Sequence, residues 1–543
     1  MSRTTRQSRR AGALATAISA VAALALVPAG AALAAPGGNS CENRNNNTIA
    51  KLVECVDADA VVGHLEALQA IADANGGNRA AGLPGYDASV EYVKEQLSAA
   101  GWKVTTDEFD YTFVGPASLQ QLTPTSTARA TESMTGTGYG TVTGTVIPVD
   151  VVLGQPNGLT VTSGCEASDF TGLGFDAPGT QIALIQRGTC EFGVKARNAQ
   201  NAGAEAVIEF NQGNTPERSV LLLGTLFGIN TQPLDVPVVG ISYADGAALA
   251  VPGSTATVTV PSPEQRPQVN VIAELPGKNT HNVVMAGAHL DSVSAGPGIN
   301  DNGSGSASLI AVAEKLSKLK PANTVRFAWW GAEEDGLLGS QAYVDGLSQA
   351  QKDDIALYMN FDMVGSPNYI QMVYDADESS WPAPVAVPAG SEAIEDLFES
   401  FYTGNAIPYD DAEFSGRSDY EAFILAGIPS GGLFTGAEVV KTAEQAAIWG
   451  GTAGAQYDPC YHQACDTIDN VNRTALDQNV DAIATAVLAY AYSTQSVNGV
   501  KGANVPGGLS LPAPAGPELT VNNPGGGGLA PGHDHGQGHA DAS

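Results

Sequence analysis

The chain is poor in basic side chains, with 25 Lys and Arg against 57 Asp and Glu among its 543 residues. The resulting formal net charge of −32 argues against nucleic acid and against an anionic membrane surface as partners, and it suits solubility in an exported protein. Beyond the first 35 residues, no apolar run approaches the ~20 residues that a membrane-spanning helix requires. We therefore expect a protein that binds neither nucleic acid nor membrane, and we expect a monomer.

Cysteine is also scarce, with six residues in the whole chain. The C-x2-C spacing of a structural zinc knot is absent. In an exported protein an even number of cysteines indicates disulfides, although six cysteines allow fifteen pairings. The spacing suggests the pairs Cys41–Cys55, Cys165–Cys190 and Cys460–Cys465.

Residues 1–35 have the features of a secretory signal. Basic residues that include Arg9 and Arg10 come first, and an Ala/Val/Leu stretch follows. The run Ala32-Leu33-Ala34 fits an A-x-A cleavage site. Export by the general secretory route or by the twin-arginine route is left open. The mature protein is expected to be secreted and extracellular.

Two separate parts of the sequence predict one α/β domain. Residues 36–115 contain a helix, a turn and a second helix, followed by an extended strand over 103–113. Residues 268–495 alternate strands, such as 283–288, with helices, such as 304–319. This alternation predicts a three-layer fold, in which a parallel or mixed sheet is covered by helices on both faces. Ligands of such folds bind beyond the C-terminal ends of the strands.

The intervening and final segments have a different composition. Residues 116–267 are rich in Thr, Gly and Val with frequent turn signals, which predicts an inserted, mostly-β domain. Residues 496–543 are rich in Gly and Pro and carry His533 and His535. They are predicted to form a flexible tail.

Histidines and acidic residues gather directly after three predicted strands and in two further loops. The segments are Ala288-His289-Leu290-Asp291, Asn300-Asp301-Asn302-Gly303, Ala332-Glu333-Glu334, Asn360-Phe361-Asp362 and Cys460-Tyr461-His462. Imidazole and carboxylate are ligands that zinc prefers. Two bridged metal ions can activate a water and polarise a carbonyl, which is what peptide hydrolysis near neutral pH requires. The five segments therefore predict one dinuclear zinc site.

Local spacing suggests how some of these side chains are arranged. Asp291 lies on the same side of an extended segment as His289 and is expected to accept a hydrogen bond from its imidazole. Asp301 precedes two glycines at a helix start, where it either caps the helix or points toward metal. Glu333 and Glu334 follow a strand, so we expect them to point to opposite sides, with one carboxylate on metal.

Longer motifs carry a resemblance to a known family. They are NGGNR at 75–79, MAGAHLDSV at 285–293, GINDNGSGS at 298–306, RFAWWGAEE at 326–334, GRSD at 416–419 and GGLFTG at 431–436. The chain resembles the secreted Streptomyces-type leucine aminopeptidases, dizinc enzymes of the bacterial leucyl aminopeptidase family, over about 58–115 and 269–493. The runs RGTCEF at 187–192 and NAQNAGA at 198–204 resemble a protease-associated domain.

The resemblance implies a set of metal ligands. His289 and Asp362 would bind one zinc ion, Glu334 and His462 would bind the other, and Asp301 would bridge them. The substrates implied are peptide or protein N-termini, with a preference for large apolar residues such as Leu.

The resemblance also implies roles for five residues around the metals. Glu333 would be the general base, and Tyr461 would donate a hydrogen bond to the tetrahedral oxyanion. Arg417 would contact substrate or product. Met363 and Phe434 would form walls of the apolar pocket. A carboxypeptidase or aminoacylase on the same site, and a non-catalytic receptor-like homologue, are the alternatives; an inactive homologue would be expected to lack Glu333 or a ligand, and this chain has them all.

The resemblance further suggests calcium. Asp477 and Asp481 are four residues apart on a predicted helix and so share a face, where a cation would offset their repulsion. The family places an additional aspartate from the N-terminal segment at such a pair. Cys55 falls near that position here, with Asp57 and Asp59 close by.

Overall fold

The computed structural model describes residues 41, 43–154, 161–215, 218–226 and 234–519. The predicted signal segment and the histidines near the C-terminal end lie outside the described residues. Residues up to Arg44 form a unit of their own, and the elements below belong to residues 45–543. Among the described residues, no helix combines the length and the apolar content that crossing a membrane requires.

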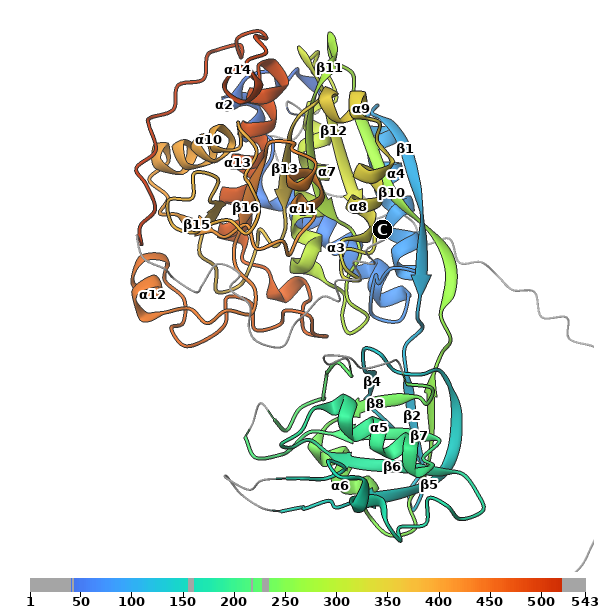
Figure 1. The fold of residues 1–543 in the computed structure, drawn as a ribbon. Helices are drawn as coiled ribbons and strands as arrows, with labels where there is room; N and C mark the ends of the chain where they lie inside the picture. Colours follow the sequence, from blue (N-terminus) through green and yellow to red (C-terminus); the bar gives the residue numbers. More distant parts are fainter. Residues whose placement is uncertain (1–40, 42, 155–160, 216–217, 227–233, 520–543) are drawn as a thin grey trace, which may run out of the picture. The chain divides into compact units, whose positions relative to one another are not determined.

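The main domain is built on one eight-stranded mixed sheet (Figure 1). Its strands, in spatial order, are β1 (Lys103–Phe113), β10 (Glu264–Leu275), β12 (Asn323–Trp330), β11 (Asn279–His289), β13 (Ile355–Phe361), β16 (Ser430–Phe434), β14 (Met372–Tyr374) and β15 (Asp410–Ala412). The four central strands β12, β11, β13 and β16 are parallel to one another, whereas β10 is antiparallel to both of its neighbours, β12 and β1. The C-terminal ends of the central strands therefore lie at one edge.

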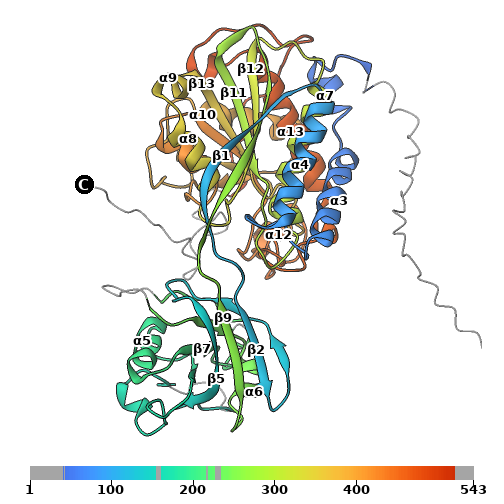
Figure 2. The same ribbon diagram turned by 90° about the vertical axis from the view of Figure 1, so that its right-hand side faces the viewer.

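Helices cover both faces of this sheet, as Figure 2 shows. One face packs against α3 (Ala58–Ala74), α4 (Pro84–Ala99), α7 (Ser304–Leu316), α10 (Glu392–Gly404) and α13 (Arg473–Tyr492). The other packs against α8 (Leu338–Gly346), α9 (Gln349–Asp354) and α11 (Tyr420–Leu425). The other helices described in this domain are α2 (Ile49–Val53), α12 (Ala443–Trp449) and α14 (Gln495–Asn498). This arrangement confirms the predicted three-layer α/β fold.

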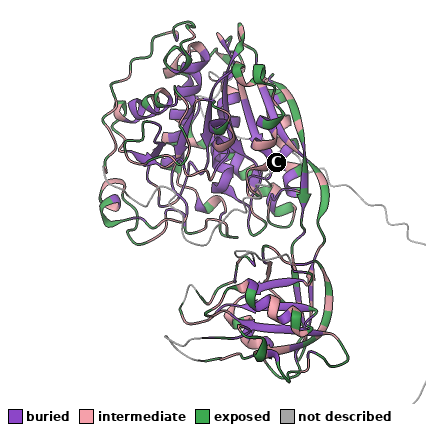
Figure 3. Cartoon of the chain, viewed as in Figure 1, coloured by how far each residue is buried: buried purple, intermediate pink, exposed green. Residues whose placement is uncertain are grey.

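Burial on both faces explains why the central strands read as continuous apolar runs (Figure 3). Every residue of β13 is buried, and so is β11 from Asn282 to His289. Helix α7 approaches the sheet closely through small residues. A Cβ at Gly305 would lie 2.0 Å from the carbonyl oxygen of Phe361, so only glycine allows this contact.

The inserted domain has its own eight-stranded mixed sheet. Its strands are, in spatial order, β3 (Thr127–Arg129), β2 (Ser118–Thr123), β9 (Thr255–Val260), β5 (Gly140–Val149), β6 (Gln181–Gln186), β7 (Ala206–Phe210), β8 (Val238–Ile241) and β4 (Glu132–Ser133). Two helices, α5 (Phe192–Ala202) and α6 (Tyr243–Leu249), pack against it. A disulfide joins Cys165 to Cys190. The predicted mostly-β insert is confirmed.

The ends of the insert differ in detail from the predicted ranges. Strand β10 pairs with β1 from Glu274 opposite Lys103 to Glu264 opposite Phe113, so residues 264–267 already belong to the main sheet. At the other end of the chain, part of the predicted flexible tail contacts the main domain. The amide of Glu518 donates to the carbonyl of Tyr409 at 2.9 Å.

Candidate metal centre

The ends of the central strands bring the predicted site residues together. His289 is the last residue of β11, Asp362 follows β13, and Glu333 and Glu334 follow β12. Asp301 lies in the turn η2 (Ile299–Gly303) that leads into α7. Because these strands are parallel, their carboxyl ends meet at one edge of the sheet, as the sequence predicted.

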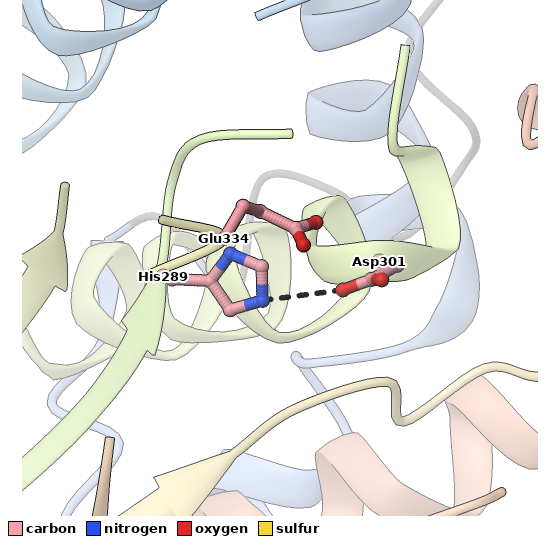
Figure 4. Close-up of side chains that lie close together, drawn as sticks. All are labelled: His289, Asp301 and Glu334. Carbon is pink, nitrogen blue, oxygen red and sulfur yellow. Dashed lines mark ion pairs between the residues drawn. The ribbon is translucent and has the colours of Figure 1, made fainter. Parts of the chain in front are cut away.

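Asp301 lies between the two histidines of the site. Its Oδ1 is 3.2 Å from Nε2 of His289, and its Oδ2 is 3.3 Å from Nε2 of His462. His289 Nε2 also lies 3.3 Å from Oδ1 of Asp362, and His462 Nε2 lies 2.9 Å from Oε2 of Glu334. Figure 4 shows the imidazole of His289 directed at Asp301, with Glu334 above them. The arrangement forms two adjacent groups of side chains that share one carboxylate.

Glu333 and Glu334 differ from the arrangement predicted from an extended chain. Strand β12 ends at Trp330, and Ala332 adopts a left-handed backbone with φ of 54°, so the chain turns before the two glutamates. As a result both carboxylates line the same pocket. Oε2 of Glu333 is 3.9 Å from His289 Nε2, farther than either aspartate oxygen.

Asp291 supports this turn more directly than it supports the histidine. Its two carboxylate oxygens accept the backbone amides of Glu333 at 3.2 Å and Glu334 at 3.3 Å. Nδ1 of His289 is 3.2 Å from the backbone oxygen of Asp291 and 3.7 Å from its carboxylate. The predicted contact with the imidazole is therefore closest at the backbone carbonyl.

The loop that carries Tyr461 and His462 is closed by a disulfide between Cys460 and Cys465, whose Cα atoms are 5.3 Å apart. Two buried aspartates flank this ring. Asp458 accepts the side-chain amide of Asn300 at 2.7 Å. Asp466 accepts the backbone amides of Asn300 and Asp301 at 2.9 and 3.0 Å, and burial raises its pKa to about 7. Cys41 and Cys55 each form a disulfide as well. That they are bonded to each other remains a prediction.

Sequence reasoning assigned no role to Arg79, which is fully buried beside the site. Its guanidinium donates to the carbonyls of Pro297 at 2.9 Å and Gly298 at 2.6 Å, and also to that of Leu290. These carbonyls belong to the segment between His289 and Asp301, so Arg79 fixes the path of the chain between these two residues. The one feature of the sequence that could have pointed to Arg79 is its place in the NGGNR motif at 75–79.

The charges of the cluster fit a cationic group. Glu334 Oε1 and Asp362 Oδ1 are buried and have no hydrogen-bond partner. Burial raises the pKa of Glu334 to about 7. Burial lowers the pKa of both histidines, but the neighbouring carboxylates outweigh it and raise them well above the usual range. Unpaired carboxylate oxygens beside two imidazoles are the donor set of a zinc site.

A pocket opens beside the cluster. Its walls include Met363, Phe434, Tyr374 and Val439, which are apolar or aromatic. The remaining lining residues are Asp301, Glu333, Glu334, Asp362, Glu413, Ser415, Arg417, Ser418, Tyr420, Ala437, Glu438, Tyr461 and His462. The three residues predicted to contact substrate, Met363, Phe434 and Arg417, thus line the same pocket as the imidazole–carboxylate cluster.

Comparison with known proteins identifies the class. The model of peptidase family M28 matches residues 270–487, and the PA domain model matches residues 142–249. An aminopeptidase of Pseudomonas aeruginosa is 44% identical over 504 residues, which cover 88% of this chain and 92% of that protein. Leucine aminopeptidase 2 of Arthroderma otae is 47% identical over 340 residues, which cover 62% of this chain and 66% of that protein. The solved structure of a zinc aminopeptidase from Bacillus subtilis matches with a TM-score of 0.59 at 26% identity and covers 80% of this chain and 94% of that one.

The helix-covered sheet and the imidazole–carboxylate cluster at its edge, together with these likenesses, define a zinc-dependent aminopeptidase. The chain belongs to peptidase family M28 and carries an inserted PA domain. The predicted class of enzyme is thereby confirmed.

Proposed function

We propose that the site holds two zinc ions and that Asp301 bridges them. The observation that carries the proposal is the position of Asp301, whose two oxygens lie 3.2 and 3.3 Å from the Nε2 atoms of two different histidines. His289 and Asp362 would hold one ion, and His462 and Glu334 would hold the other. Each pair brings its donor atoms within 3.3 Å, so each group needs only small adjustments to bind metal.

Glu333 is the proposed general base. When bound, the two ions would activate a water molecule and polarise the scissile carbonyl. Glu333 would accept the proton of that water and deliver it to the leaving amine. Its carboxylate lies at the edge of the ligand cluster, 3.9 Å from His289 Nε2. Burial raises the pKa of Glu333 well above its usual range, which makes its carboxylate a stronger proton acceptor than a solvent-exposed one.

Tyr461 is the proposed donor to the oxyanion. Its ring stacks on His462 with centroids 3.8 Å apart, which holds it beside a proposed metal ligand. Burial raises the pKa of Tyr461 well above its usual range, so the phenol keeps its proton. Arg417 Nη2 lies 3.4 Å from the phenol oxygen and Arg417 Nη1 lies 2.8 Å from Glu438. Arg417 also lines the pocket, which supports the proposal that it contacts substrate or product.

The substrate side of the proposal is a peptide whose first residue is large and apolar, such as Leu. Met363, Phe434, Tyr374 and Val439 give the pocket apolar walls next to the cluster. The similarity to leucine aminopeptidase 2 supports the same preference.

A comparison of nitroanilide substrates tests this function. Leucyl-nitroanilide should be cleaved rapidly, glycyl-nitroanilide slowly, and N-acetyl-leucyl-nitroanilide not at all, because an aminopeptidase requires a free amine. Metal analysis should find two zinc ions per chain, and a chelator should abolish turnover. Rapid cleavage of the acetylated substrate, or full activity with one zinc per chain, would contradict the proposal.

We also propose that the protein is secreted and acts as a monomer on peptide N-termini. The disulfides Cys165–Cys190 and Cys460–Cys465 support an oxidising compartment. The net charge of −32 favours solubility and disfavours nucleic acid. Detection of the protein in the culture medium, lacking the predicted signal segment 1–35, would test export.

A calcium site at Asp477 and Asp481 is a further proposal. We propose Asp57 as the third carboxylate of this site, because its charge contributes to the raised pKa of Asp481. Asp59 forms an ion pair with Arg473 instead. The amide of Ala58 donates to Asp477 Oδ1 at 2.9 Å, so the start of α3 is fixed against α13 at this point. Two aspartates on α13 and one directly before α3 offer carboxylate oxygens, the kind of ligand that calcium prefers.

A further inference from the structure

Asp362 presents only one of its carboxylate oxygens to the metal cluster. Oδ1 faces His289 Nε2 at 3.3 Å and has no hydrogen-bond partner. Oδ2 accepts a hydrogen bond from the hydroxyl of Ser418 at 2.6 Å. The two oxygens therefore have different tasks, because one is free for a cation and the other is tied to the protein.

Ser418 is the last member of a chain of buried hydrogen bonds. Nε1 of Trp330 donates to the hydroxyl of Tyr358 at 2.8 Å, and that hydroxyl donates to Oδ1 of Asn360 at 2.9 Å. Nδ2 of Asn360 then donates to the hydroxyl of Ser418, also at 2.9 Å. The side chains of Trp330, Tyr358, Asn360 and Ser418 are at most 4% exposed, so water does not compete for these bonds.

The direction of the bonds in this chain follows from its two ends. The indole N–H of Trp330 can only donate and the carboxylate of Asp362 accepts at the other end, so each group between them accepts from one neighbour and donates to the next. The oxygen of the Asn360 amide then faces Tyr358, and its NH2 group faces Ser418. Ser418 receives that bond and has one proton left to give, which goes to Asp362. Reversing any step would place two donors or two acceptors against each other.

Glycine at position 287 makes the first bond of the chain possible. Trp330 is on β12 and Tyr358 is on β13, and β11 lies between these strands. A Cβ at Gly287 of β11 would lie 2.4 Å from the Tyr358 hydroxyl and 2.5 Å from Trp330 Nε1. The absent side chain thus leaves the gap in which the two groups meet. Phe423 of α11 stacks on the Tyr358 ring at 3.8 Å and closes this layer from outside.

We propose that the chain Trp330–Tyr358–Asn360–Ser418 is a positioning device for Asp362, and that it makes this carboxylate bind zinc through Oδ1 alone. The inference rests on the proposed function, in which Asp362 is a zinc ligand. Ser418, Asn360 and Tyr358 are positioning residues, since they act on the metal through Asp362. Partners that orient a metal ligand contribute about 10–100-fold in metal affinity.

Zinc affinity tests the device without relying on turnover. The metal-free protein is titrated with zinc against a chelator of known affinity, for the wild type and for Ser418→Ala, Ser418→Thr, Tyr358→Phe and Asp362→Asn. Ser308→Ala is the matched control, because Ser308 is fully buried and its hydroxyl donates to the carbonyl of Ser304 within α7, away from the chain of bonds that ends at Asp362. Thermal melting of each metal-free variant is recorded beside the titration.

Ser418→Ala should weaken one of the two zinc ions by about 10–100-fold, while its metal-free melting temperature changes no more than that of Ser308→Ala. Ser418→Thr should restore the affinity because it keeps the hydroxyl. Tyr358→Phe should lower the affinity for the same zinc ion to a smaller degree, because without the phenol hydroxyl the Asn360 amide can rotate by about 180°. This variant also tests the proposal if Ser418→Ala fails to fold.

Two results separate the possible failures. If Ser418→Ala and Tyr358→Phe bind both ions as tightly as the wild type while Asp362→Asn loses one, the positioning device is wrong and the ligand assignment stands. If Asp362→Asn keeps both ions at wild-type affinity, the proposed ligand set itself is wrong.

Discussion

The carboxylate of Asp291 accepts the backbone amide of Glu333 at 3.2 Å. Its second oxygen accepts the next amide, that of Glu334, so one side chain fixes the turn that carries the proposed base and a proposed ligand. In Asp291→Asn, an NH2 group would face one of these two N–H groups. We expect kcat to fall about 10–100-fold with a smaller effect on KM. Steady-state kinetics on leucyl-nitroanilide measures this, and unchanged kcat would show that the turn is held by other contacts.

The two adjacent glutamates should respond differently to the same substitution. Glu333→Gln cannot accept the water proton, so turnover should fall by about 10²–10⁴-fold with two zinc ions retained. Glu334→Gln should weaken one zinc ion instead, and excess zinc should restore part of the activity. Metal content measured beside turnover distinguishes them. Loss of zinc in Glu333→Gln with both ions kept in Glu334→Gln would reverse the assignment.

The disulfide Cys460–Cys465 should matter more for the site than for stability. It closes a short loop, and short loops add little stabilisation through the unfolded state. Asp458 and Asp466 also hold the ring from both sides. Replacing both cysteines by serine should therefore reduce zinc retention or kcat while the melting temperature changes little. A large drop in melting temperature with full activity would contradict this.

The inserted domain should be dispensable for hydrolysis of small substrates. Phe113 on β1 pairs with Glu264 on β10, so a short Asn-Gly-type turn can join these strands in place of residues 114–263. The shortened enzyme should cleave leucyl-nitroanilide at nearly the wild-type rate, and differences should appear only with longer peptides. Loss of activity in a folded, zinc-loaded deletion variant would show that the insert contributes to the chemistry.

The calcium proposal has a distinctive pH dependence. Burial, then the charges of Asp477 and Asp57, raise the pKa of Asp481 to about 7. The folded protein therefore holds a proton that the unfolded chain loses near pH 4, so without calcium this group makes stability fall as pH rises from about 4 to about 7. Calcium should raise the melting temperature at pH 8 and have little effect at pH 5.

The matched variants for this measurement are Asp481→Asn and Glu395→Gln. Glu395 lies in a separate cluster of carboxylates that includes Asp375 and Asp411, where burial raises the pKa of Glu395 to about 9. Asp481→Asn should abolish the calcium effect at pH 8, and Glu395→Gln should preserve it. The opposite pattern would place calcium at the second cluster.

The sequence predicted the fold, and which side chains gather at one edge of the sheet, because both depend on local patterns. The apolar run before His289 predicted β11, and the placement of acidic residues after parallel strands predicted that they meet. The turn of Glu333 and Glu334 could not be predicted, because it depends on the left-handed Ala332 and on Asp291, which lies 42 positions away in the sequence.

Contacts between distant segments could not be predicted from the sequence either. Arg79 reads as one residue of a loop, and only the folded chain places its guanidinium against the carbonyls of Pro297 and Gly298. Ser418 was part of a recognised motif, yet its role follows from Trp330 and Tyr358 on other strands. Such roles arise from the strand order, which composition and periodicity do not encode.

The pairing of β1 with β10 has a consequence for a chain that has been cut. The inserted domain interrupts the main domain at the tip of a two-stranded ladder that runs from Lys103 opposite Glu274 to Phe113 opposite Glu264. A protease that cleaves the insert outside the loop closed by the disulfide Cys165–Cys190 would leave this ladder intact, and the N-terminal fragment would keep α3, α4 and Arg79 bound to the rest of the site. The two fragments would behave as a non-covalent pair that complement each other, so the nicked enzyme would migrate as two bands under denaturing conditions and still hydrolyse its substrates.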